Sequence, residues 1–238
     1  MKTLQLLLLM LTMFATNIAA QTSEKFDELL TSAKTGDASA QNSVAICYIK
    51  GIGTEKDKET AVKWFTLAAN QGYAKAEHNL GLCYLNGDGV DQDCATAVLW
   101  FRKSAAKGNM KAQYDLALCL AQGKGTNKDT YEAAKWYLKA ADQGYAKAQC
   151  NIGTLYSQGI GVKKDHTEAV RWFTLAAKQG LSSAERNLGI CYLNGEGVKK
   201  SKTKAKEWLK KAEAHGDTTA ARICQENGWT VVTYENAL

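Results

Sequence analysis

The stretch that decides the fold runs from Tyr73 to Gly108 and reads YAKAEHNLGLCYLNGDGVDQDCATAVLWFRKSAAKG. Three of its features recur along the chain at a fixed step of 36 residues. The first is a single glycine, at Gly36, Gly72, Gly108, Gly144, Gly180 and Gly216. The second is a G-x-G pair, at Gly51/Gly53, Gly87/Gly89, Gly123/Gly125, Gly159/Gly161 and Gly195/Gly197, and the third is a tryptophan, at Trp64, Trp100, Trp136, Trp172 and Trp208. A fixed period carried in register by glycines and aromatic residues indicates a repeat solenoid.

The composition fits a helical chain with no nucleic-acid partner. None of the 238 residues is proline, which is typical of a chain that is nearly all helix. The formal charge of +6 is spread over a long sequence. The densest basic stretch, Lys199 to Lys211, is interrupted by Ala, Glu, Trp and Leu at helical spacing, which predicts a solvated helix face.

Each repeat reads as two helices. Residues 74–86 place Ala76, Leu80 and Tyr84 on one side of a helix, and Gly81 beside them suggests the close approach of a neighbouring helix. The loop N-G-D-G-V follows, where glycine supplies positive φ. A second helix then carries A-V-x-W-F and ends at the period-marking glycine. Its expected N-caps are Asp57, Asp93, Asp129, Asp165 and Ser201, followed in two repeats by Glu132 and Glu168 in an arrangement like a capping box.

The pattern resembles the Sel1-like repeat, a relative of the tetratricopeptide repeat. The residues that match it in one repeat are Ala76, Leu80, Gly81, Tyr84, Gly87, Gly89, Val90, Asp93, Ala97, Trp100, Ala105 and Ala106. The resemblance covers roughly Gly36 to Gly216, five repeats. It implies an all-α, right-handed superhelical solenoid of stacked antiparallel helix pairs.

The period divides the chain into eight segments. Residues 1–20 are expected to be a signal peptide and residues 21–36 an N-terminal capping helix. The five repeats are assigned to 37–72, 73–108, 109–144, 145–180 and 181–216. Residues 217–238 form a predicted C-terminal capping helix and a tail, because end repeats of a solenoid cover its core. The role of residues 229–238 is left open.

The N-terminal segment predicts export. Lys2 precedes an apolar run from Leu4 to Ala15, and Ala19-Ala20 supply small residues before Gln21, the expected mature N-terminus. The protein is therefore expected in the periplasm or outside the cell, with no stable membrane insertion after cleavage. The alternative is an uncleaved anchor formed by residues 4–20, which approach spanning length.

The seven cysteines are interpreted mainly as buried thiols. Cys47, Cys83, Cys119 and Cys191 share one register, whose spacing of about 8–10 Å between stacked helices exceeds the reach of a disulfide. The redox states of Cys94 and Cys150 are left open. A cysteine-rich branch of the resembled family pairs cysteines seven residues apart, and no C-x7-C occurs here. That difference argues against the β-lactamase activity attributed to that branch.

No catalytic or cofactor-binding constellation is recognisable. The three histidines, His78, His166 and His215, occupy different registers and do not cluster with cysteines at metal-ligand spacing. The G-x-G pairs lie between helices and lack the strand and third glycine of a dinucleotide site. We therefore expect a non-enzymatic protein with no metal and no cofactor. An amide hydrolase of β-lactamase type is kept as an alternative that rests on fold-level analogy alone.

The resemblance implies a partner-binding surface, because Sel1-like arrays present the first helix of each repeat along a concave surface. Its outward residues are predicted to be Ser39, Asn42, Ile46, Lys50, Lys75, His78, Leu82, Asn86, Lys111, Tyr114, Leu118, Gln122, Lys147, Cys150, Thr154, Gln158, Ser183, Arg186, Ile190 and Asn194. This basic, amide-rich stripe with an apolar seam suits an extended peptide or an acidic helix of a partner protein. The sequence therefore predicts an interaction scaffold or adaptor that is itself a monomer. A secreted factor that binds a host protein through the same surface is an alternative.

Overall fold

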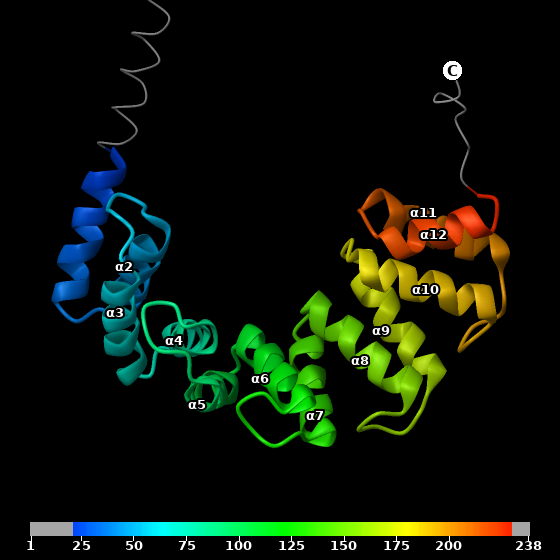
Figure 1. Ribbon diagram of the computed structural model, residues 1–238, viewed down its shortest axis with the longest axis horizontal. Coiled ribbons are helices and arrows are strands. Elements are labelled where there is room, and N and C mark those ends of the chain that lie inside the picture. The colour runs from blue at the N-terminus through cyan, green and yellow to red at the C-terminus, as the bar shows by residue number, and fades with distance from the viewer. Residues whose placement is uncertain (1–20, 230–238) are drawn as a thin grey trace, which may run out of the picture. The chain divides into compact units, whose positions relative to one another are not determined.

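The computed structural model describes residues 21–229, and every regular element in that range is a helix (Figure 1). The predicted signal peptide and residues 230–238 of the tail lie outside the described residues. Residues 21–34 are helical, and they are followed by α2 (Ala38–Lys50), α3 (Lys58–Asn70), α4 (Ala74–Asn86), α5 (Cys94–Ala106), α6 (Met110–Gln122), α7 (Thr130–Asp142), α8 (Ala146–Gln158), α9 (His166–Lys178), α10 (Ser182–Asn194), α11 (Lys202–Ala214) and α12 (Thr218–Glu226).

The helices pack as consecutive pairs. The pairs α2–α3, α4–α5, α8–α9 and α10–α11 make the most extensive contacts, and contacts between α3 and α4, α7 and α8, α9 and α10, and α11 and α12 join successive pairs. We call the first helix of each repeat helix A (α2, α4, α6, α8, α10) and the second helix B (α3, α5, α7, α9, α11). The chain divides within α6 into two compact units, unit 1 (Met1–Ala112) and unit 2 (Gln113–Leu238). The structure confirms the predicted all-α stack of 36-residue helix pairs.

The predicted N-caps begin the helix B segments. The Asp57 carboxylate accepts a hydrogen bond from the Thr60 backbone N–H at 2.9 Å. The same contact is made by Asp93, Asp129, Asp165 and Ser201. Such a cap satisfies an N–H that has no partner inside the helix, and it stabilises a protein by about 0.5–2 kcal/mol. Of the two capping-box glutamates, Glu132 accepts from the Trp136 indole N–H at 3.1 Å and Glu168 accepts from Arg171 at 3.0 Å.

A glycine in helix A lets the two helices of a repeat approach each other. A methyl group at Gly81 would lie 2.6 Å from Phe101 Cε1, and one at Gly153 would lie 2.8 Å from Phe173 Cδ1. Atoms at that separation overlap, so glycine allows the aromatic ring of helix B to rest against the helix A backbone. The predicted close approach is confirmed.

The second glycine of the G-x-G pair does more than turn the chain. All these glycines have positive φ, as expected. A methyl group at Gly89 would clash with the carbonyl group of Lys58, and one at Gly161 with that of Thr130. Each of these carbonyl groups belongs to the first residue of the preceding helix B. The loop of one repeat therefore rests on the start of helix B in the repeat before it.

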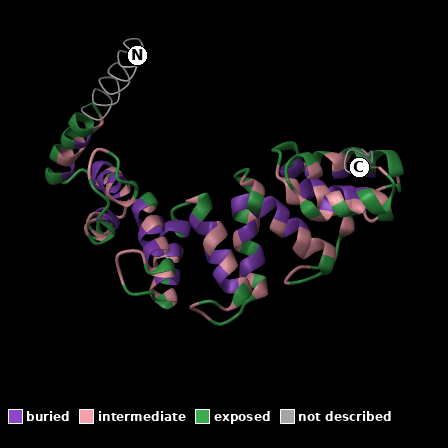
Figure 2. Ribbon diagram, turned by 45° about the horizontal axis from the view of Figure 1, so that its top comes forward, coloured by how far each residue is buried: buried purple, intermediate pink, exposed green. Residues whose placement is uncertain are grey.

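Alanines, one large side chain per helix B and aliphatic side chains of helix A such as Leu80 and Leu116 form the core, and the loops are largely exposed (Figure 2). Phe101 is fully buried and Phe65, Tyr137 and Phe173 are each 3% exposed. Among the five tryptophans that mark the period, Trp172 is the one that is buried. The other four are half-buried and lie at the edge of this core. Lys103 Nζ lies 4.0 Å from the Trp100 ring centroid, a cation–π contact repeated by Lys139 and Trp136 at 4.1 Å. Four of the five repeat tryptophans therefore cover the edge of the core, where they are half-buried.

All seven cysteines are free thiols. Six are buried and Cys94 is half-buried, so the interpretation of Cys47, Cys83, Cys119 and Cys191 as buried thiols is confirmed. Burial raises the pKa of the Cys83 and Cys191 thiols to about 11. Within residues 21–229, no helix is both long and apolar enough to cross a bilayer.

Candidate partner-binding face

The predicted binding residues occupy four rows along the helix A segments, which we call the helix A face. The first row is Ser39, Lys75, Lys111, Lys147 and Ser183. The second row is Asn42, His78, Tyr114, Cys150 and Arg186. The third row is Ile46, Leu82, Leu118, Thr154 and Ile190, and the fourth row is Lys50, Asn86, Gln122, Gln158 and Asn194.

Three of the four rows reach solvent. The first row is exposed apart from the half-buried Ser183, and the fourth row is exposed throughout. The third row is half-buried in all five repeats. In each unit the face therefore offers a partly accessible seam, mostly aliphatic, with lysine and amide groups on its flanks.

The second row is not presented to a partner in unit 1. Asn42 is 5% exposed, and its Oδ1 accepts from Asn79 Nδ2 of the next repeat at 2.9 Å. His78 is 7% exposed, and its ring centroid lies 5.8 Å from that of Phe101. The predicted exposure of these two side chains is wrong, because neighbouring helices cover this position.

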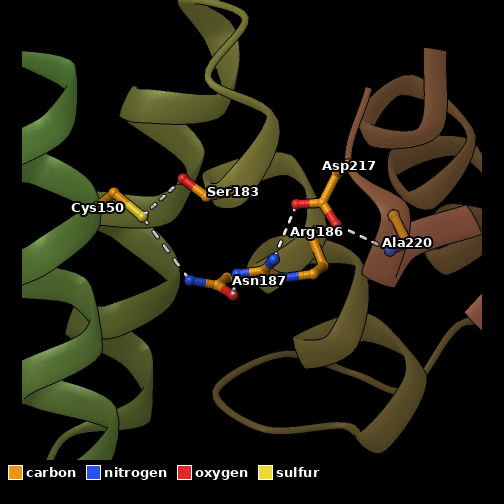
Figure 3. Close-up of polar contacts among 6 residues, drawn as sticks. All are labelled: Cys150, Ser183, Arg186, Asn187, Asp217 and Ala220. Atoms are coloured by element: carbon orange, nitrogen blue, oxygen red, sulfur yellow. Dashed lines mark hydrogen bonds and ion pairs between the residues drawn. The ribbon is translucent and has the colours of Figure 1, made fainter. Parts of the chain in front are cut away.

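The second row joins neighbouring repeats in unit 2 as well (Figure 3). Cys150 Sγ lies 3.6 Å from Ser183 Oγ and 3.7 Å from Asn187 Nδ2, so α8 and α10 meet at a buried thiol. Tyr114 is half-buried and packs edge-on against Tyr145, with 5.2 Å between ring centroids. Cys150 and Tyr114 therefore support the stack, and the predicted exposure of Cys150 is also wrong.

Arg186 fixes the C-terminal helix. Its Nη1 donates to Asp217 Oδ2 at 2.8 Å, and Asp217 Oδ1 accepts from the Ala220 backbone N–H at 2.9 Å (Figure 3). Asp217 thus caps α12 while it neutralises Arg186, and its side chain is only 7% exposed. The Arg186 charge is already paired within the chain, which makes it a poor contact for an acidic partner.

The structure brings three predicted residues together around one small hollow in unit 2. Thr154 and Gln158 of α8 and Ile190 of α10 line it together with Ser157, Phe173 and Glu196, and its volume is about 160 Å³. Two larger hollows, of 610 and 550 Å³, are lined by residues 23–31 and by the loop at 54–59 with its neighbours. Neither of these contains a residue of the helix A face.

Sequence reasoning missed a buried polar pair that every repeat contains. A residue of helix A that is at most 5% exposed contacts a side chain 30 residues later, just after helix B. Three repeats use two glutamines, joined at 2.8 or 2.9 Å: Gln41–Gln71, Gln113–Gln143 and Gln149–Gln179. The other two use a charged pair, Glu77–Lys107 at 2.5 Å and Glu185–His215 at 2.8 Å. The available signal was that glutamate replaces glutamine only where lysine or histidine follows 30 residues later.

The glutamine of this pair also reaches the preceding repeat. Gln41 Nε2 donates to the Ala33 carbonyl and Gln149 Nε2 to the Ala141 carbonyl, both at 3.1 Å. A glutamate cannot donate in this way. In the second repeat the link to the preceding repeat is made by the other member of the pair, since Lys107 Nζ donates to the Gly72 carbonyl at 2.8 Å.

No metal-binding arrangement occurs among residues 21–229, where no three His, Cys, Asp or Glu side chains converge. The histidines have separate surroundings. His78 packs in the core, His215 contacts Glu185, and His166 Nδ1 lies 3.9 Å from Glu196 Oε2 at the start of α9.

Comparison with known proteins points to one family. The model of the Sel1 repeat matches residues 38–73, 74–109, 111–145, 146–181 and 182–217. A solved Sel1 repeat protein from Oxalobacter formigenes is 36% identical, covering 90% of this chain and 85% of its own, with a TM-score of 0.80. A putative Sel1 repeat protein from Klebsiella pneumoniae shares the fold, at 23% identity, a TM-score of 0.53 and coverage of 85% of this chain and 99% of its own. No curated protein matches the sequence.

A third similar structure is much longer than this chain. It is a protective antigen present in uropathogenic Escherichia coli strains, 38% identical over 82% of this chain, with a TM-score of 0.80. The match covers 42% of the antigen, so this chain corresponds to about two fifths of that protein.

Proposed function

The chain belongs to the Sel1 repeat family, and we propose that it is a non-enzymatic scaffold that binds a partner protein or peptide on the helix A face. The observation that carries the proposal is the third row. Its side chains stay half-buried in all five repeats, while the residue just before each of them in the same helix is buried. When a partner covers a seam of this kind, further apolar surface is removed from contact with water, which favours binding.

The flanking rows supply the polar part of such an interface. The amides of Asn86, Gln122, Gln158 and Asn194 are exposed, and amides hydrogen-bond the backbone of an extended peptide. Lys75 and Lys111 in unit 1 and Lys147 in unit 2 are exposed and suit carboxylate side chains. The partner that fits is therefore a segment with acidic residues near the lysines and apolar residues over the seam.

Export of the protein is part of the proposal. The apolar segment after Lys2 supports it, and so does the similarity to a protein described as a protective antigen. A partner outside the cytosol, including a host protein, is compatible with the same face.

The test is capture of the partner with a charge-reversed chain and a matched control. Lys75→Glu, Lys111→Glu and Lys147→Glu together change the formal charge from +6 to 0, since each reversal removes two charges. Lys63→Glu, Lys124→Glu and Lys178→Glu change it equally, at exposed positions of helix B or a loop. Each chain is used to capture proteins from exported and cytosolic fractions of the source cells. We expect one partner to be retained by the unmodified and control chains and lost by the helix A variant.

Two results would overturn the proposal. Equal retention of the partner by both triple variants would remove the helix A face as the binding surface. Turnover of a chromogenic β-lactam by the purified chain would instead support the hydrolase alternative.

A further inference from the structure

We propose that the 160 Å³ hollow between α8 and α10 is a socket for the ammonium group of a lysine side chain carried by an extended partner segment. This inference rests on the proposed function and names one anchor of the partner. The ligand group is a cation with several hydrogen-bond donors at the end of an alkyl chain. The chemical reasons are the size of the hollow, its acceptor atoms and its apolar wall.

The hollow exists where helix A has short polar side chains in place of large apolar ones. Thr154 and Ser157 of α8 line it. At the same register α2 has Ile46 and Ile49, and α4 has Leu82 and Leu85. A polar substitution at two positions that are apolar in other repeats sacrifices packing, which is expected where a protein retains a binding site.

The two hydroxyl groups of the hollow are arranged to accept hydrogen bonds. Thr154 Oγ1 donates to the Cys150 carbonyl at 3.1 Å, and Ser157 Oγ donates to the Thr154 carbonyl at 2.8 Å. Each hydroxyl hydrogen is therefore engaged with the helix backbone, and the oxygens keep lone pairs for a donor. The Glu196 carboxylate adds a negative charge to the lining.

The charge of Glu196 is only lightly engaged within the chain. Its Oε1 accepts from Asn194 Nδ2 at 3.1 Å, and its Oε2 lies 3.9 Å from His166 Nδ1. The guanidinium group of Arg186 on α10 is held by Asp217 instead, at 2.8 Å. Glu196 is also close enough to Cys191 to help raise the pKa of that buried thiol, after the larger effect of burial. A cation in the hollow would gain a charge-assisted hydrogen bond.

Size and shape favour lysine over a larger ligand or an arginine. The volume is below the roughly 300–1,000 Å³ of small-molecule pockets, so one side chain fits better than a cofactor. Ile190 and Phe173 supply an apolar wall for an alkyl stem. An arginine prefers two parallel bonds to one carboxylate, whereas Glu196 already uses one oxygen for Asn194. A compact ammonium with three donors matches the separate acceptors.

The test uses NMR titration of the isotope-labelled protein with Nα-acetyl-lysine amide, and with Nα-acetyl-norleucine amide as the probe lacking the ammonium group. We expect the lysine probe to shift the amide resonances of Ser157, Ile190 and Gly195, with a Kd on the order of 1–10 mM for so small a ligand. The norleucine probe should bind at least about tenfold more weakly, the expected loss for a charge-assisted hydrogen bond.

Three variants localise the effect. Glu196→Gln removes the charge and keeps the shape. Thr154→Leu with Ser157→Leu fills the hollow with the residues found at the equivalent positions Leu82 and Leu85, so this variant is expected to fold. Both changes should abolish the lysine-dependent shifts. Asp88→Asn is the matched control, because Asp88 occupies the place of Glu196 in unit 1 and is paired there with Lys58 at 2.6 Å.

The outcomes separate the socket from the proposed function. Equal binding of the two probes, or lysine-dependent shifts that survive both hollow variants, would overturn the socket. Tighter binding of Nα-acetyl-arginine amide would overturn the choice of lysine. Loss of partner capture in the helix A triple variant without any probe binding would leave the scaffold standing and remove the socket. If the lysine probe binds but partner capture is unaffected by the helix A triple variant, the socket stands and the helix A face is removed as the partner-binding surface.

Discussion

Glycines with the same backbone conformation have different surroundings in this chain. Gly144 closes a helix B with φ of 88° and has no atom within 4 Å of where a side chain would begin. Gly161, with φ of 69°, lies against the carbonyl group of Thr130 in the preceding repeat. Gly144 is required only for its backbone conformation, whereas Gly161 is required both for its conformation and because a side chain would not fit.

We therefore expect Gly161→Ala to destabilise the protein more than Gly144→Ala. Gly144→Ala should cost about 1–2 kcal/mol, the cost of a left-handed conformation for an alanine. Gly161→Ala should cost about 1–3 kcal/mol more, because the added methyl group overpacks against backbone that has little freedom to move. Urea unfolding of the two variants measures the difference. Equal losses would show that the loop does not depend on its contact with Thr130.

Residue-level prediction succeeded where the cause is local. Asp57 caps its helix because the carboxylate and the N–H it accepts from lie within four residues, so the sequence pattern contains both partners. His78 was misplaced because its burial depends on α5, whose Phe101 ring packs against it. A helical projection places His78 on the outward side of one helix and contains no information about what covers that side.

At the scale of elements, the buried pair in each repeat fastens helix A to the end of helix B. In the second repeat Glu77 has 3% of its side chain exposed, and Lys107 provides the compensating charge. Lys107→Ala would leave a buried carboxylate without a cation, and a loss of about 3 kcal/mol in unfolding free energy is expected, at the low end because Lys107 itself is 41% exposed.

The chain offers its own rescue for that variant. The double variant Glu77→Gln, Lys107→Gln introduces into the second repeat the glutamine pair that three other repeats use. It should recover most of the lost stability. Chemical denaturation of both variants, run at the same pH and salt concentration, provides the comparison. A double variant as unstable as Lys107→Ala would show that the charge of Glu77 is not the source of the loss.

The sequence contained this pairing, but periodicity alone did not reveal it. The partners are 30 residues apart and neither stands out by residue type, since glutamine and lysine are common on helix surfaces. Only the burial of Gln41 and its equivalents shows that the position faces inward. The hollow was invisible for a related reason. Short side chains at Thr154 and Ser157 are plain in the sequence, but the space they leave depends on how α10 packs against α8.

At the scale of the whole molecule, the free thiols predict loss of stability in alkaline solution. The pKa of Cys83 and of Cys191 rises from 9.0 to about 11 on burial. The folded protein therefore holds these protons more tightly than the unfolded chain, so their contribution is complete below about pH 9 and disappears as the pH rises toward 11.

Unfolding free energies measured between pH 8 and 10.5, with a reductant present, check this expectation. The variant Cys83→Ala with Cys191→Ala should be less stable at pH 8, because it loses buried atoms, and should decline less steeply with pH. Burial also raises the pKa of Tyr137, which both proteins retain, so some decline is expected in each. Parallel curves for the two proteins would contradict the assignment to the thiols.

The architecture of the whole chain was the most predictable level, because the 36-residue period repeats the same pattern of capping residues, turn glycines and apolar positions five times. Helix boundaries, turn glycines and the free state of the four in-register thiols, Cys47, Cys83, Cys119 and Cys191, followed from it. The division into two compact units did not, since nothing in the period marks Ala112 as different from its equivalents. What distinguishes the repeats is carried by the few positions that depart from the consensus, and their meaning required the structure.

The buried pair has a consequence for how such a gene can change. Both side chains of each pair belong to one repeat, and the link to the preceding repeat runs through a backbone carbonyl that every sequence supplies. A duplication or deletion in steps of one whole repeat therefore inherits a matched pair. A crossover between the codons of Glu77 and Lys107 would instead join Glu77 to a glutamine whenever the other copy is one of the three repeats that use a glutamine pair. The protein's own chemistry thus makes the 36-residue cassette the unit in which this lineage can lengthen or shorten without a folding defect.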